Sequence, residues 1–402
     1  MNPITAPNGT VLVINAGSSS IKYQLVDPVG GEAIASGIVE RIGQDVGIVT
    51  HKYAGSEARL DQPVADHSVG LRLVLDLFAK HGPDLDAAHI VAVGHRVVQG
   101  GAVFSGPVVV TDEVVEQIRA LVPLAPLHNP GHVAGLEVAR ELLPDVPHVV
   151  VFDTAFFQTL PKAAYTYAIP PAVAEANQIR RYGFHGTSHE FVSKAAAEFV
   201  GRPLEDLRQI VLHLGNGASV SAVRGGRAVD TSMGLTPLEG LVMGTRSGDI
   251  DPAVIFHLHR EGKMSIDEID TLLNKQSGML GLTGESDFRA IHDLVAEGDA
   301  SAVLGLEVYA HRLKKYVGAY LAVLGGADVI TFTAGIGEND DVVRWQALAG
   351  LEELGIELDA DLNAGRIKQP KVISTPSSRV TVLVVPTNEE LAIARQAVEL
   401  AG

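Results

Sequence analysis

VLVINAGSSSIKYQLV, residues Val11 to Val26, contains two apolar runs separated by a turn of small and polar residues. The first run is β-branched and predicts a buried strand, whereas the second alternates apolar and polar residues and predicts a half-buried strand. Between them, Asn15 to Gly17 and three serines leave backbone N–H groups open to an anion, and Lys22 adds a cation. The stretch therefore predicts either an ordinary β-hairpin or a hairpin whose turn faces phosphate.

The composition excludes several classes of protein. A chain of 402 residues is long for one hydrophobic core, which favours two domains or a duplicated one. The formal net charge of -17 argues against a nucleic-acid or anionic-membrane surface, so an anionic substrate would need local arginines or a metal ion. The sequence has no cysteine, which excludes disulfides, thiolate catalysis and cysteine-bound metal. Because neither a signal-peptide pattern nor an apolar run of about 20 residues is present, we expect a soluble, cytoplasmic protein.

The first part of the chain mixes strand and helix patterns, as α/β proteins do. A helix is predicted after PLHNP, with Asn129 as its N-cap and Pro144 at its end. The apolar strand Val149 to Phe152 then delivers Asp153 at its carboxyl end, where open α/β sheets place their ligands. Further strands are expected at 90–93 and 108–110, and further helices at 68–80 and 112–121.

A domain boundary is expected between Asp153 and Ala168, where the pattern becomes irregular and rich in proline. In the helix predicted after His185, Thr187 and Glu190 have the spacing of a capping box. The apolar face of this helix is expected to consist of Phe191, Val192, Ala195, Ala196 and Phe199, and Gly201 should end it.

QIVLHLGNGASVSAVRGG, residues 209–226, repeats the order of the opening stretch: an apolar strand, a small-residue turn and an alternating strand. A third small-residue turn, Gly335 to Asn339, follows the strand Val329 to Phe332 and precedes a helix. Two such hairpins, one at the head of each half, suggest a duplicated fold with a nucleotide held between the halves. The sequence contains neither a Walker A motif nor GxGxxG, which favours a duplicated actin-like architecture. Helices are also expected at 267–273, 300–324 and 389–400, the last after the strand TVLVVP.

Ten motifs in order resemble those of the acetate kinase family, within the acetate and sugar kinase, heat-shock protein and actin superfamily. They are NAGSSSIK (15–22), GHRVVQGG (94–101), APLHNP (125–130), FDTAFF (152–157), RRYGFHGTSH (180–189), HLGNG (213–217), MGTRSGDIDP (243–252), SDFR (286–289), AGIGEN (334–339) and TNEE (387–390). Two departures are an N-terminal extension of about eight residues and Ala334, where the family pattern leads us to expect glycine.

The resemblance implies an α/β protein with a duplicated actin-like, ribonuclease H-like fold and an active-site cleft between two domains. Residues 1–156 would form the N-terminal domain, with the helix 389–402 packing back on it. Residues 157–388 would form the nucleotide-binding C-terminal domain. The resemblance also implies a homodimer that acts on small molecules, with no nucleic-acid or membrane partner. Closure of the two halves around ATP should exclude water.

The activity implied by the resemblance is reversible transfer of the ATP γ-phosphoryl group to acetate, giving acetyl phosphate and ADP by direct in-line transfer. Mg²⁺ would be required, with Mn²⁺ as an alternative. A propionate or butyrate kinase remains open, because one methylene in an apolar pocket discriminates by only about 1–3 kcal/mol. A non-catalytic nucleotide-dependent binding protein would lack the convergent set of Arg96, Asp153, His185 and Arg246. A polyphosphate or nucleotide hydrolase would not need a carboxylate clamp.

By the same resemblance, His185 and Arg246 would stabilise the charge on the transferring phosphoryl group, and Asp153 would be the third catalytic residue. Because a carboxylic acid titrates near ~4, the acceptor needs no general base. Asp153 is therefore expected to orient a metal or position the nucleophile, with an acid–base role as the alternative. The substrate-binding residues would be Arg96 as a fork for the carboxylate, with Val98, Leu127, His128, Phe184 and Pro237.

Metal binding is expected at Asn15 and Glu389, a sparse set that suits Mg²⁺ with its retained waters. Glu389 has a simpler explanation too, since acidic residues stabilise the first turn of any helix. The nucleotide-binding residues carried over from the family are Lys22, His213, Leu214, Gly215, Asn216, Gly217, Asp287, Phe288, Arg289, Gly335, Ile336, Gly337, Glu338 and Asn339.

Overall fold

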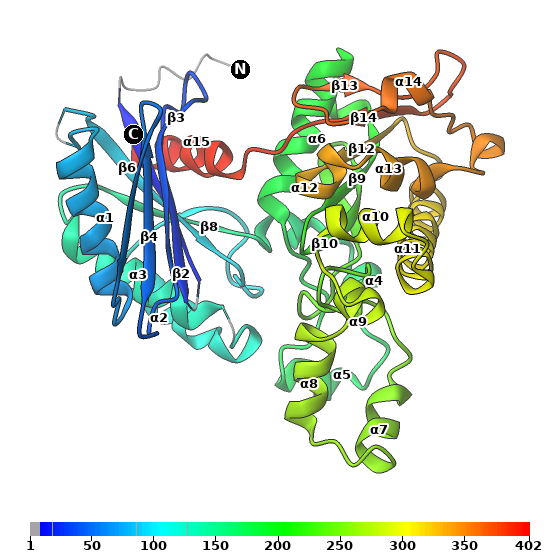
Figure 1. Ribbon diagram of the computed structural model, residues 1–402, viewed down its shortest axis with the longest axis horizontal. Helices are drawn as coiled ribbons and strands as arrows, with labels where there is room; N and C mark the ends of the chain where they lie inside the picture. The colour runs from blue at the N-terminus through cyan, green and yellow to red at the C-terminus, as the bar shows by residue number, and fades with distance from the viewer. Residues whose placement is uncertain (1–8, 18, 86, 127) are drawn as a thin grey trace. The chain divides into compact units, whose positions relative to one another are not determined.

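The structure, a computed structural model, describes residues 9–17, 19–85, 87–126 and 128–402. The chain divides into two compact units: unit 1 comprises Met1–Phe156 and Asn388–Gly402, and unit 2 comprises Phe157–Thr387 (Figure 1). Each unit contains one mixed β-sheet. Within the described ranges, no helix is both long enough and apolar enough to cross a membrane.

The sheet of unit 1 has the strand order β5-β4-β3-β2-β1-β6-β8-β7. Its strands are β1 (Thr10–Ala16), β2 (Ser20–Val26), β3 (Ala33–Glu40), β4 (Gly47–Tyr53), β5 (Ser56–Gln62), β6 (Ile90–Val97), β7 (Val108–Val109) and β8 (His148–Phe152). Strands β1 to β5 form an antiparallel meander, whereas β1, β6 and β8 run parallel. The predicted opening hairpin is confirmed, with Val11 opposite Val26 and Asn15 opposite Lys22.

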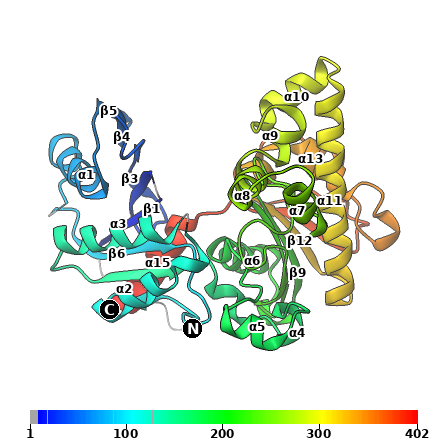
Figure 2. The same ribbon diagram turned by 90° about the horizontal axis from the view of Figure 1, so that it is seen from below.

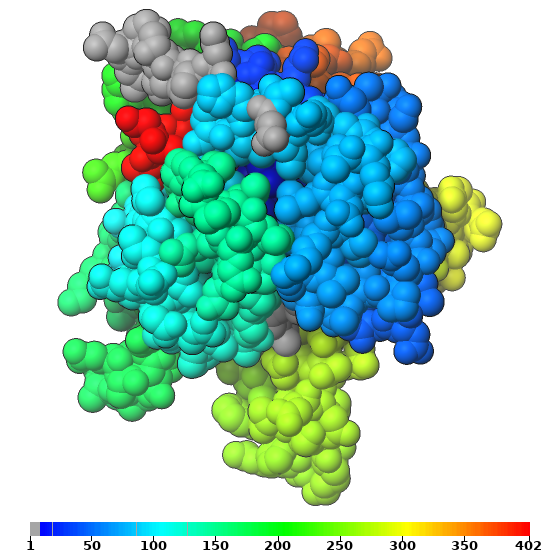
Figure 3. All heavy atoms as spheres, turned by 90° about the vertical axis from the view of Figure 1, so that its left-hand side faces the viewer, coloured from blue at the N-terminus to red at the C-terminus, as the bar shows by residue number. Residues whose placement is uncertain are grey.

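Helices cover both faces of this sheet, which explains why β1 and β8 are almost entirely buried. On one face, α1 (His67–His81) and α3 (Asn129–Leu142) pack together and enclose a core with Leu12, Ile14 and Phe78. In Figure 3 their side chains leave only a small area of the dark-blue first strands visible. The C-terminal helix α15 (Glu389–Ala401) packs against β1, β6 and β8 from the other side (Figure 2). Helix α2 (Asp112–Ala120) packs on α3.

The sheet of unit 2 has the strand order β11-β10-β9-β12-β14-β13. Its strands are β9 (Arg208–Leu214), β10 (Ala218–Arg224), β11 (Arg227–Thr231), β12 (Val329–Thr333), β13 (Lys371–Val372) and β14 (Thr381–Val384). Here too the first three strands form an antiparallel meander, and the first strand continues into two parallel strands. The series β3-β2-β1-β6-β8 and β11-β10-β9-β12-β14 therefore have one topology, so the predicted duplicated actin-like fold is confirmed.

Helices α4 to α6 of unit 2 precede its first strand, and its other helices lie in the connections between its strands. In chain order, the helices are α4 (Lys162–Tyr165), α5 (Pro171–Ala176), α6 (Gly186–Val200), α7 (Ala253–Arg260), α8 (Ile266–Lys275), α9 (Gly278–Thr283), α10 (Phe288–Ala296), α11 (Ala300–Leu324), α12 (Ala334–Asn339), α13 (Asp341–Leu348) and α14 (Ala360–Asn363). Helices α6 and α11 pack against β9, and α11 also packs against β10.

Two predicted helix starts are wrong in detail. Asn129 does not cap α3, because its amide accepts from Gln99 N–H and donates to Gln99 C=O, which leaves His128 at the N-cap. Thr187 does not form a capping box either, since α6 begins at Gly186 after His185 and Thr187 is already buried inside the first turn. Phe199, expected on the buried face of α6, is 45% exposed.

The third small-residue turn is also not an open turn. Residues 334–339 form the short helix α12 directly after β12. Ala334 has a φ of 65°, in the left-handed region that favours glycine, at the position where a glycine was expected. Its N–H donates to the Glu338 carboxylate at 2.9 Å, so this backbone conformation is held by a hydrogen bond.

We predict that Ala334→Gly leaves the stability of the protein unchanged or raises it by up to about 1 kcal/mol. Relief of the left-handed strain, about 1–2 kcal/mol, offsets the greater entropy that glycine gives the unfolded chain, about 0.4–1 kcal/mol. The matched control is Ala319→Gly, at an exposed position inside α11, which should destabilise by about 1 kcal/mol. Thermal unfolding midpoints measure both changes, and an equal loss in the two variants would contradict the argument.

Candidate functional site

The turn of the opening hairpin is fixed by hydrogen bonds inside unit 1. Gly17 N–H donates to Ser20 C=O at 2.7 Å, and the Nε2 atom of His67 donates to Gly17 C=O at 2.7 Å. His67 stands at the start of α1, so this helix holds the turn in place. Ser18 lies outside the described residues. Asn15, one of the two predicted metal-site residues, is half-buried on β1, and Lys22 opposite to it is exposed.

Arg96 and Asp153 meet at the carboxyl ends of two parallel strands, β6 and β8. The guanidinium donates from Nε to Asp153 Oδ1 at 2.9 Å and from Nη2 to Oδ2 at 2.7 Å. The Arg96 fork, expected to hold a substrate carboxylate, is thus engaged by a carboxylate of the protein. The Nη1 amino group takes no part in this pair. The Asp153 side chain is 1% exposed and that of Arg96 is 20% exposed.

Glu389, the first residue of α15, adds a second carboxylate to this pair. Its Oε2 lies 3.9 Å from Arg96 Nε. Burial by itself lowers the pKa of the Arg96 guanidinium. The nearby carboxylates of Asp153 and Glu389 raise this pKa by more, so the net shift is upward. Burial raises the pKa of Glu389 to about 7; Arg96 lowers it, and Asp153 raises it. Two carboxylates therefore share one cation, and unit 1 holds an excess of buried negative charge here.

The segment after β6 carries Val98, which is 7% exposed. The Asn129 amide bridges the backbone of Gln99, so this segment is joined to the start of α3, where His128 is the N-cap. The predicted substrate residues Arg96, Val98 and His128 thus come from two segments that the structure ties together. Leu127, also predicted to contact the substrate, lies outside the described residues.

In unit 2, His185 and Arg246 both face the glycine turn between β9 and β10. A Cβ atom built on Gly217 would lie 3.3 Å from His185 Nε2 and 3.5 Å from Arg246 Nη1. Arg246 donates from Nη1 to the C=O of Pro237 at 3.2 Å, and burial lowers its pKa. Among the described residues, no carboxylate lies within ion-pair distance of Arg246. Two nitrogen atoms, one from each side chain, thus lie close to the backbone of Gly217.

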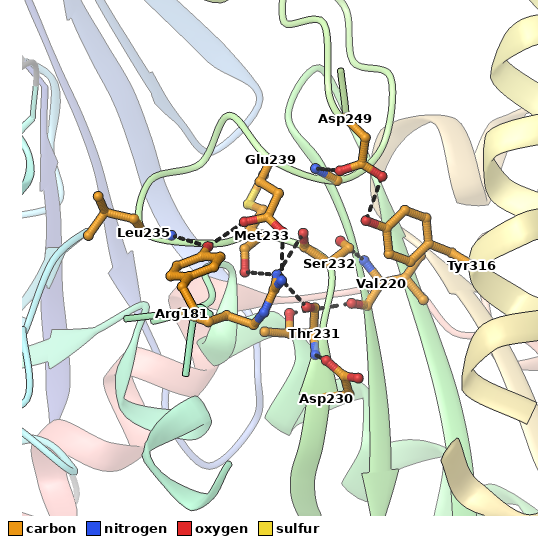
Figure 4. Close-up of polar contacts among 12 residues, drawn as sticks. Arg181, Val220, Asp230, Thr231, Ser232, Met233, Leu235, Glu239, Asp249 and Tyr316 are labelled. Atoms are coloured by element: carbon orange, nitrogen blue, oxygen red, sulfur yellow. Dashed lines mark hydrogen bonds and ion pairs between the residues drawn. The ribbon is translucent and has the colours of Figure 1, made fainter. Parts of the chain in front are cut away.

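The loop that carries Pro237 is held by a second arginine, Arg181, which the sequence analysis did not single out (Figure 4). Arg181 Nη1 donates to the C=O groups of three consecutive residues, 231–233, at 3.0–3.2 Å. Its Nη2 donates to Glu239 at 2.6 Å, and Tyr167 donates to the other oxygen of the same carboxylate. Phe184, the predicted substrate contact before His185, is buried at 1% exposure, and Pro237 is half-buried.

A cavity of about 730 Å³ in unit 2 brings together much of the predicted nucleotide set. The lining residues are Asn216, Ser286, Asp287, Phe288, Arg289, His292, Gly335, Ile336, Asn339, Asp340, Asp341, Val342 and Arg366. Asp287 caps α10 and forms an exposed ion pair with Arg289. Phe288 is 7% exposed and stacks edge-to-face on Tyr309 at 4.9 Å, so it also belongs to the core.

Other members of that set do not line the cavity. Glu338 turns inward and accepts hydrogen bonds from the N–H groups of Ala334 and Thr387. Gly337 C=O accepts from the fully buried Arg344. His213 stacks on His185 at 4.3 Å, and Leu214 is buried at the end of β9. Lys22 belongs to unit 1.

His292 is a cavity residue that the sequence analysis missed. Its Nε2 donates to Asp340 at 2.7 Å, and this hydrogen bond raises the pKa of His292. Asp340 also caps α13, so the pair joins α10 to the start of α13 on the two sides of the cavity. The spacing of histidine and aspartate, 48 residues apart, gives no sign of this contact before folding.

Comparisons with known proteins agree with these observations. The model of the acetokinase family matches residues 10–395. An acetate kinase from Clavibacter michiganensis subsp. michiganensis is 58% identical over 386 residues, which cover 96% of this chain and 98% of that protein. An acetate kinase from Streptomyces avermitilis is 55% identical over 98% of this chain and 97% of its own length.

Solved structures give the same result. The crystal structure of Porphyromonas gingivalis acetate kinase matches with a TM-score of 0.94 at 43% identity, covering 98% of this chain and 100% of its own. A propionate kinase from Francisella tularensis subsp. tularensis matches with a TM-score of 0.91 at 39% identity over the same shares. With its duplicated fold, its motifs in order and a family match along nearly its whole length, the chain belongs to the acetokinase family of kinases.

Proposed function

We propose that the protein transfers the γ-phosphoryl group of ATP to acetate, giving acetyl phosphate and ADP, in a reversible Mg²⁺-dependent reaction. The observation that carries the proposal is Arg246, a half-buried guanidinium with no carboxylate partner in the described chain, beside Nε2 of His185. An isolated cation in such surroundings is costly unless an anion binds there. Negative charge on the transferring phosphoryl group would be stabilised by Arg246 and by His185 beside it.

The acceptor carboxylate would be bound by Arg96. Since Asp153 occupies Nε and Nη2, the remaining Nη1 group would make the contact, so an end-on contact replaces the expected bidentate fork. Asp153 then has the role of a positioning residue, because it fixes the guanidinium from behind. A carboxylic acid titrates near pH ~4, so acetate is already deprotonated at neutral pH and the reaction needs no base here. For the methyl end of acetate, Val98, Phe184 and Pro237 stay our candidates, and all three are at least partly buried.

Asn15 and Glu389 fit a role in holding Mg²⁺. Glu389 and Asp153 share the single charge of Arg96, and burial keeps the pKa of Glu389 near 7, so an added cation would be favourable beside them. Mg²⁺ takes few protein ligands and keeps several waters, which suits one carboxylate and one amide. When bound, the metal ion would supply charge neutralisation to the phosphate groups of ATP.

For the nucleotide, the cavity beside α10 and α12 is the candidate site. It collects Asn216, the segment Asp287–Arg289, and Gly335, Ile336 and Asn339 around one volume of about 730 Å³, a size that suits a small-molecule ligand. The other predicted contacts, His213, Leu214, Gly215, Gly217, Gly337, Glu338 and Lys22, stay predictions, as do the homodimer and the cytoplasmic location.

A propionate or butyrate kinase is the second candidate function. It is supported by the structural relative from Francisella tularensis, whose name is propionate kinase. The apolar residues named above do not decide between acids that differ by one methylene, because the difference in binding free energy is only about 1–3 kcal/mol. A non-catalytic binding protein is the less favoured alternative, since the chain belongs to a family of kinases.

We predict that the protein, supplied with ATP and Mg²⁺, forms an acyl phosphate that hydroxylamine traps, with the highest kcat/KM for acetate. The matched series is acetate, propionate and butyrate at equal ionic strength. A preference for propionate would identify the second candidate. No hydroxamate from any of the three acids, with ATP hydrolysis unchanged by them, would contradict carboxylate phosphorylation altogether.

Two arginine variants separate the proposed roles of the residues. Arg96→Lys keeps a cation beside Asp153 but lacks Nη1, so the KM for acetate should rise by about tenfold or more, with a smaller fall in kcat. Arg246→Lys should mainly lower kcat, because it removes a contact that strengthens in the transition state. Steady-state kinetics with both substrates measure the difference. If Arg246→Lys changed only the KM for acetate and Arg96→Lys only kcat, the two assignments would be reversed.

A further inference from the structure

Three buried side chains of unit 2 form a continuous hydrogen-bonded chain that ends at the half-buried ring of His185. Ser221 Oγ lies 2.8 Å from His189 Nδ1, and His189 Nε2 lies 2.7 Å from Ser219 Oγ. The Ser219 hydroxyl in turn lies 3.0 Å from Nδ1 of His185. His189, Ser219 and Ser221 are fully buried. We call these residues, Ser221, His189, Ser219 and His185, the serine–histidine relay.

Two elements create the relay. Ser219 and Ser221 alternate along β10, so their side chains point to the same face of the sheet. His185 and His189 are separated by one turn at the start of α6 and therefore lie on the same side of this helix. The ring of His213 stacks on His185 at 4.3 Å, and Ser188 holds Nδ1 of His213 at 2.8 Å.

We propose that Ser219 and His189 are positioning residues that direct Nε2 of His185 to the turn at Gly217 and, when a phosphoryl group is bound there, keep the proton on that nitrogen. The inference rests on the proposed function, in which His185 faces the transferring phosphoryl group. His185 has a φ of 61°, a conformation that a residue with a side chain adopts only where its surroundings fix it. Besides the stacked ring of His213, the relay is the part of those surroundings that contacts the ring itself.

Counting donors allows two proton orders along the relay. Ser219 has one hydroxyl proton and two histidine neighbours, so it donates to one ring and accepts from the other. If it donates to Nδ1 of His185, it accepts from Nε2–H of His189, and His189 Nδ1 then accepts from Ser221. Every member of the relay is satisfied in this order, and neutral His185 carries its proton on Nε2.

The opposite order also satisfies every member of the relay, so the bound phosphoryl group decides between the two. The opposite order would place the proton of neutral His185 on Nδ1 and leave a lone pair on Nε2, which would repel phosphoryl oxygens at the position beside Gly217. Burial lowers the pKa of His189 well below its usual value, so this ring stays neutral with one N–H. Ser219 thereby links the neutral, buried His189 by hydrogen bonds to His185, the histidine that faces the phosphoryl group in the proposed function.

The test is Ser219→Ala in the full-length protein, with Ser193→Ala as the matched control. Ser193 is also fully buried, but its hydroxyl only donates to Glu190 C=O within α6. We expect Ser219→Ala to lower kcat at least tenfold while the KM values for ATP and acetate stay within about twofold of the unchanged protein. Ser193→Ala should change neither. A kcat for Ser219→Ala equal to that of the control would overturn the proposal.

A spectroscopic readout separates this inference from the proposed function. In protein labelled with ¹⁵N-histidine, long-range ¹H–¹⁵N spectra report which ring nitrogen carries the proton, and a His185→Gln sample assigns the signals. With ATP and Mg²⁺ bound, we expect the Nε2–H form of His185 with a hydrogen-bonded Nδ1 in the unchanged protein and in Ser193→Ala, and a changed Nδ1 chemical shift from loss of that hydrogen bond in Ser219→Ala. This result would stand even if no acid were phosphorylated, whereas the hydroxylamine assay tests the function alone.

A second variant covers the case in which Ser219→Ala does not fold. Ser221→Ala leaves Ser219 in place and removes only the donor to His189 Nδ1, so the relay loses its first hydrogen bond. We expect the same change of the His185 signals with smaller amplitude and a smaller loss of kcat. Unchanged His185 signals in Ser221→Ala, as in the Ser193→Ala control, would show that no relay sets the tautomer.

Discussion

The need to bind anions inside a protein of net charge -17 is the constraint on which the architecture depends. The overall field repels phosphate and carboxylate, so attraction has to come from a few cations held at fixed points. We propose that Arg96 in unit 1 and Arg246 in unit 2 are such points. Arg96 is fixed by a bidentate contact with Asp153, and Arg246 is half-buried without a carboxylate partner in the part of the chain described. The first is oriented by the protein, and the second stays open to a ligand.

Duplication of one topology provides the places for these groups. In both units an antiparallel meander leads into parallel strands, and the functional residues follow strand ends: Asp153 after β8, and Gly215 to Gly217 after β9. Carboxyl ends of parallel strands gather at one edge of a sheet, which brings residues far apart in sequence together. The Arg96–Asp153 pair, 57 residues apart, is formed in this way. In unit 2, His185 at the start of α6 likewise lies beside the turn after β9, although the two segments are far apart in the sequence.

Much of the fold followed from local patterns. The two hairpins, α8, α11 and the last helix were predictable because hydrophobic periodicity and β-branched runs report burial directly. The failure of Asn129 to cap α3 could not be foreseen, because its amide is taken by the backbone of Gln99, 30 residues earlier. Helix α12 was not predicted: Gly335 to Asn339 were expected to form a turn, but they belong to a short helix whose first residue, Ala334, has a left-handed φ. In such cases a tertiary contact outweighs local preference.

The candidate site, too, could be predicted from the sequence only in part. Family motifs pointed to Arg96, Asp153, His185 and Arg246, but they gave no information on the residues that orient them. His67, Arg181, His189, Ser219 and His292 came to light only with the structure, because single histidines, serines and arginines have no periodic signal. The one sequence hint was the four-residue spacing of His185 and His189, which places both rings on one side of a helix. Orientation of reactive groups by their neighbours is thus the part that folding adds.

In the proposed reaction, the phosphoryl group would pass in a single step from ATP to the carboxylate, with no covalent intermediate on the protein. The sequence has no cysteine, and the Ser219 hydroxyl beside His185 is already engaged by two histidine rings. The most direct test uses ATP whose γ-phosphorus is chiral through oxygen isotopes, and determines the configuration of the acyl phosphate formed. One in-line transfer predicts inversion at phosphorus. Retention would require two transfers through a phosphorylated residue and would contradict the proposed single-step transfer.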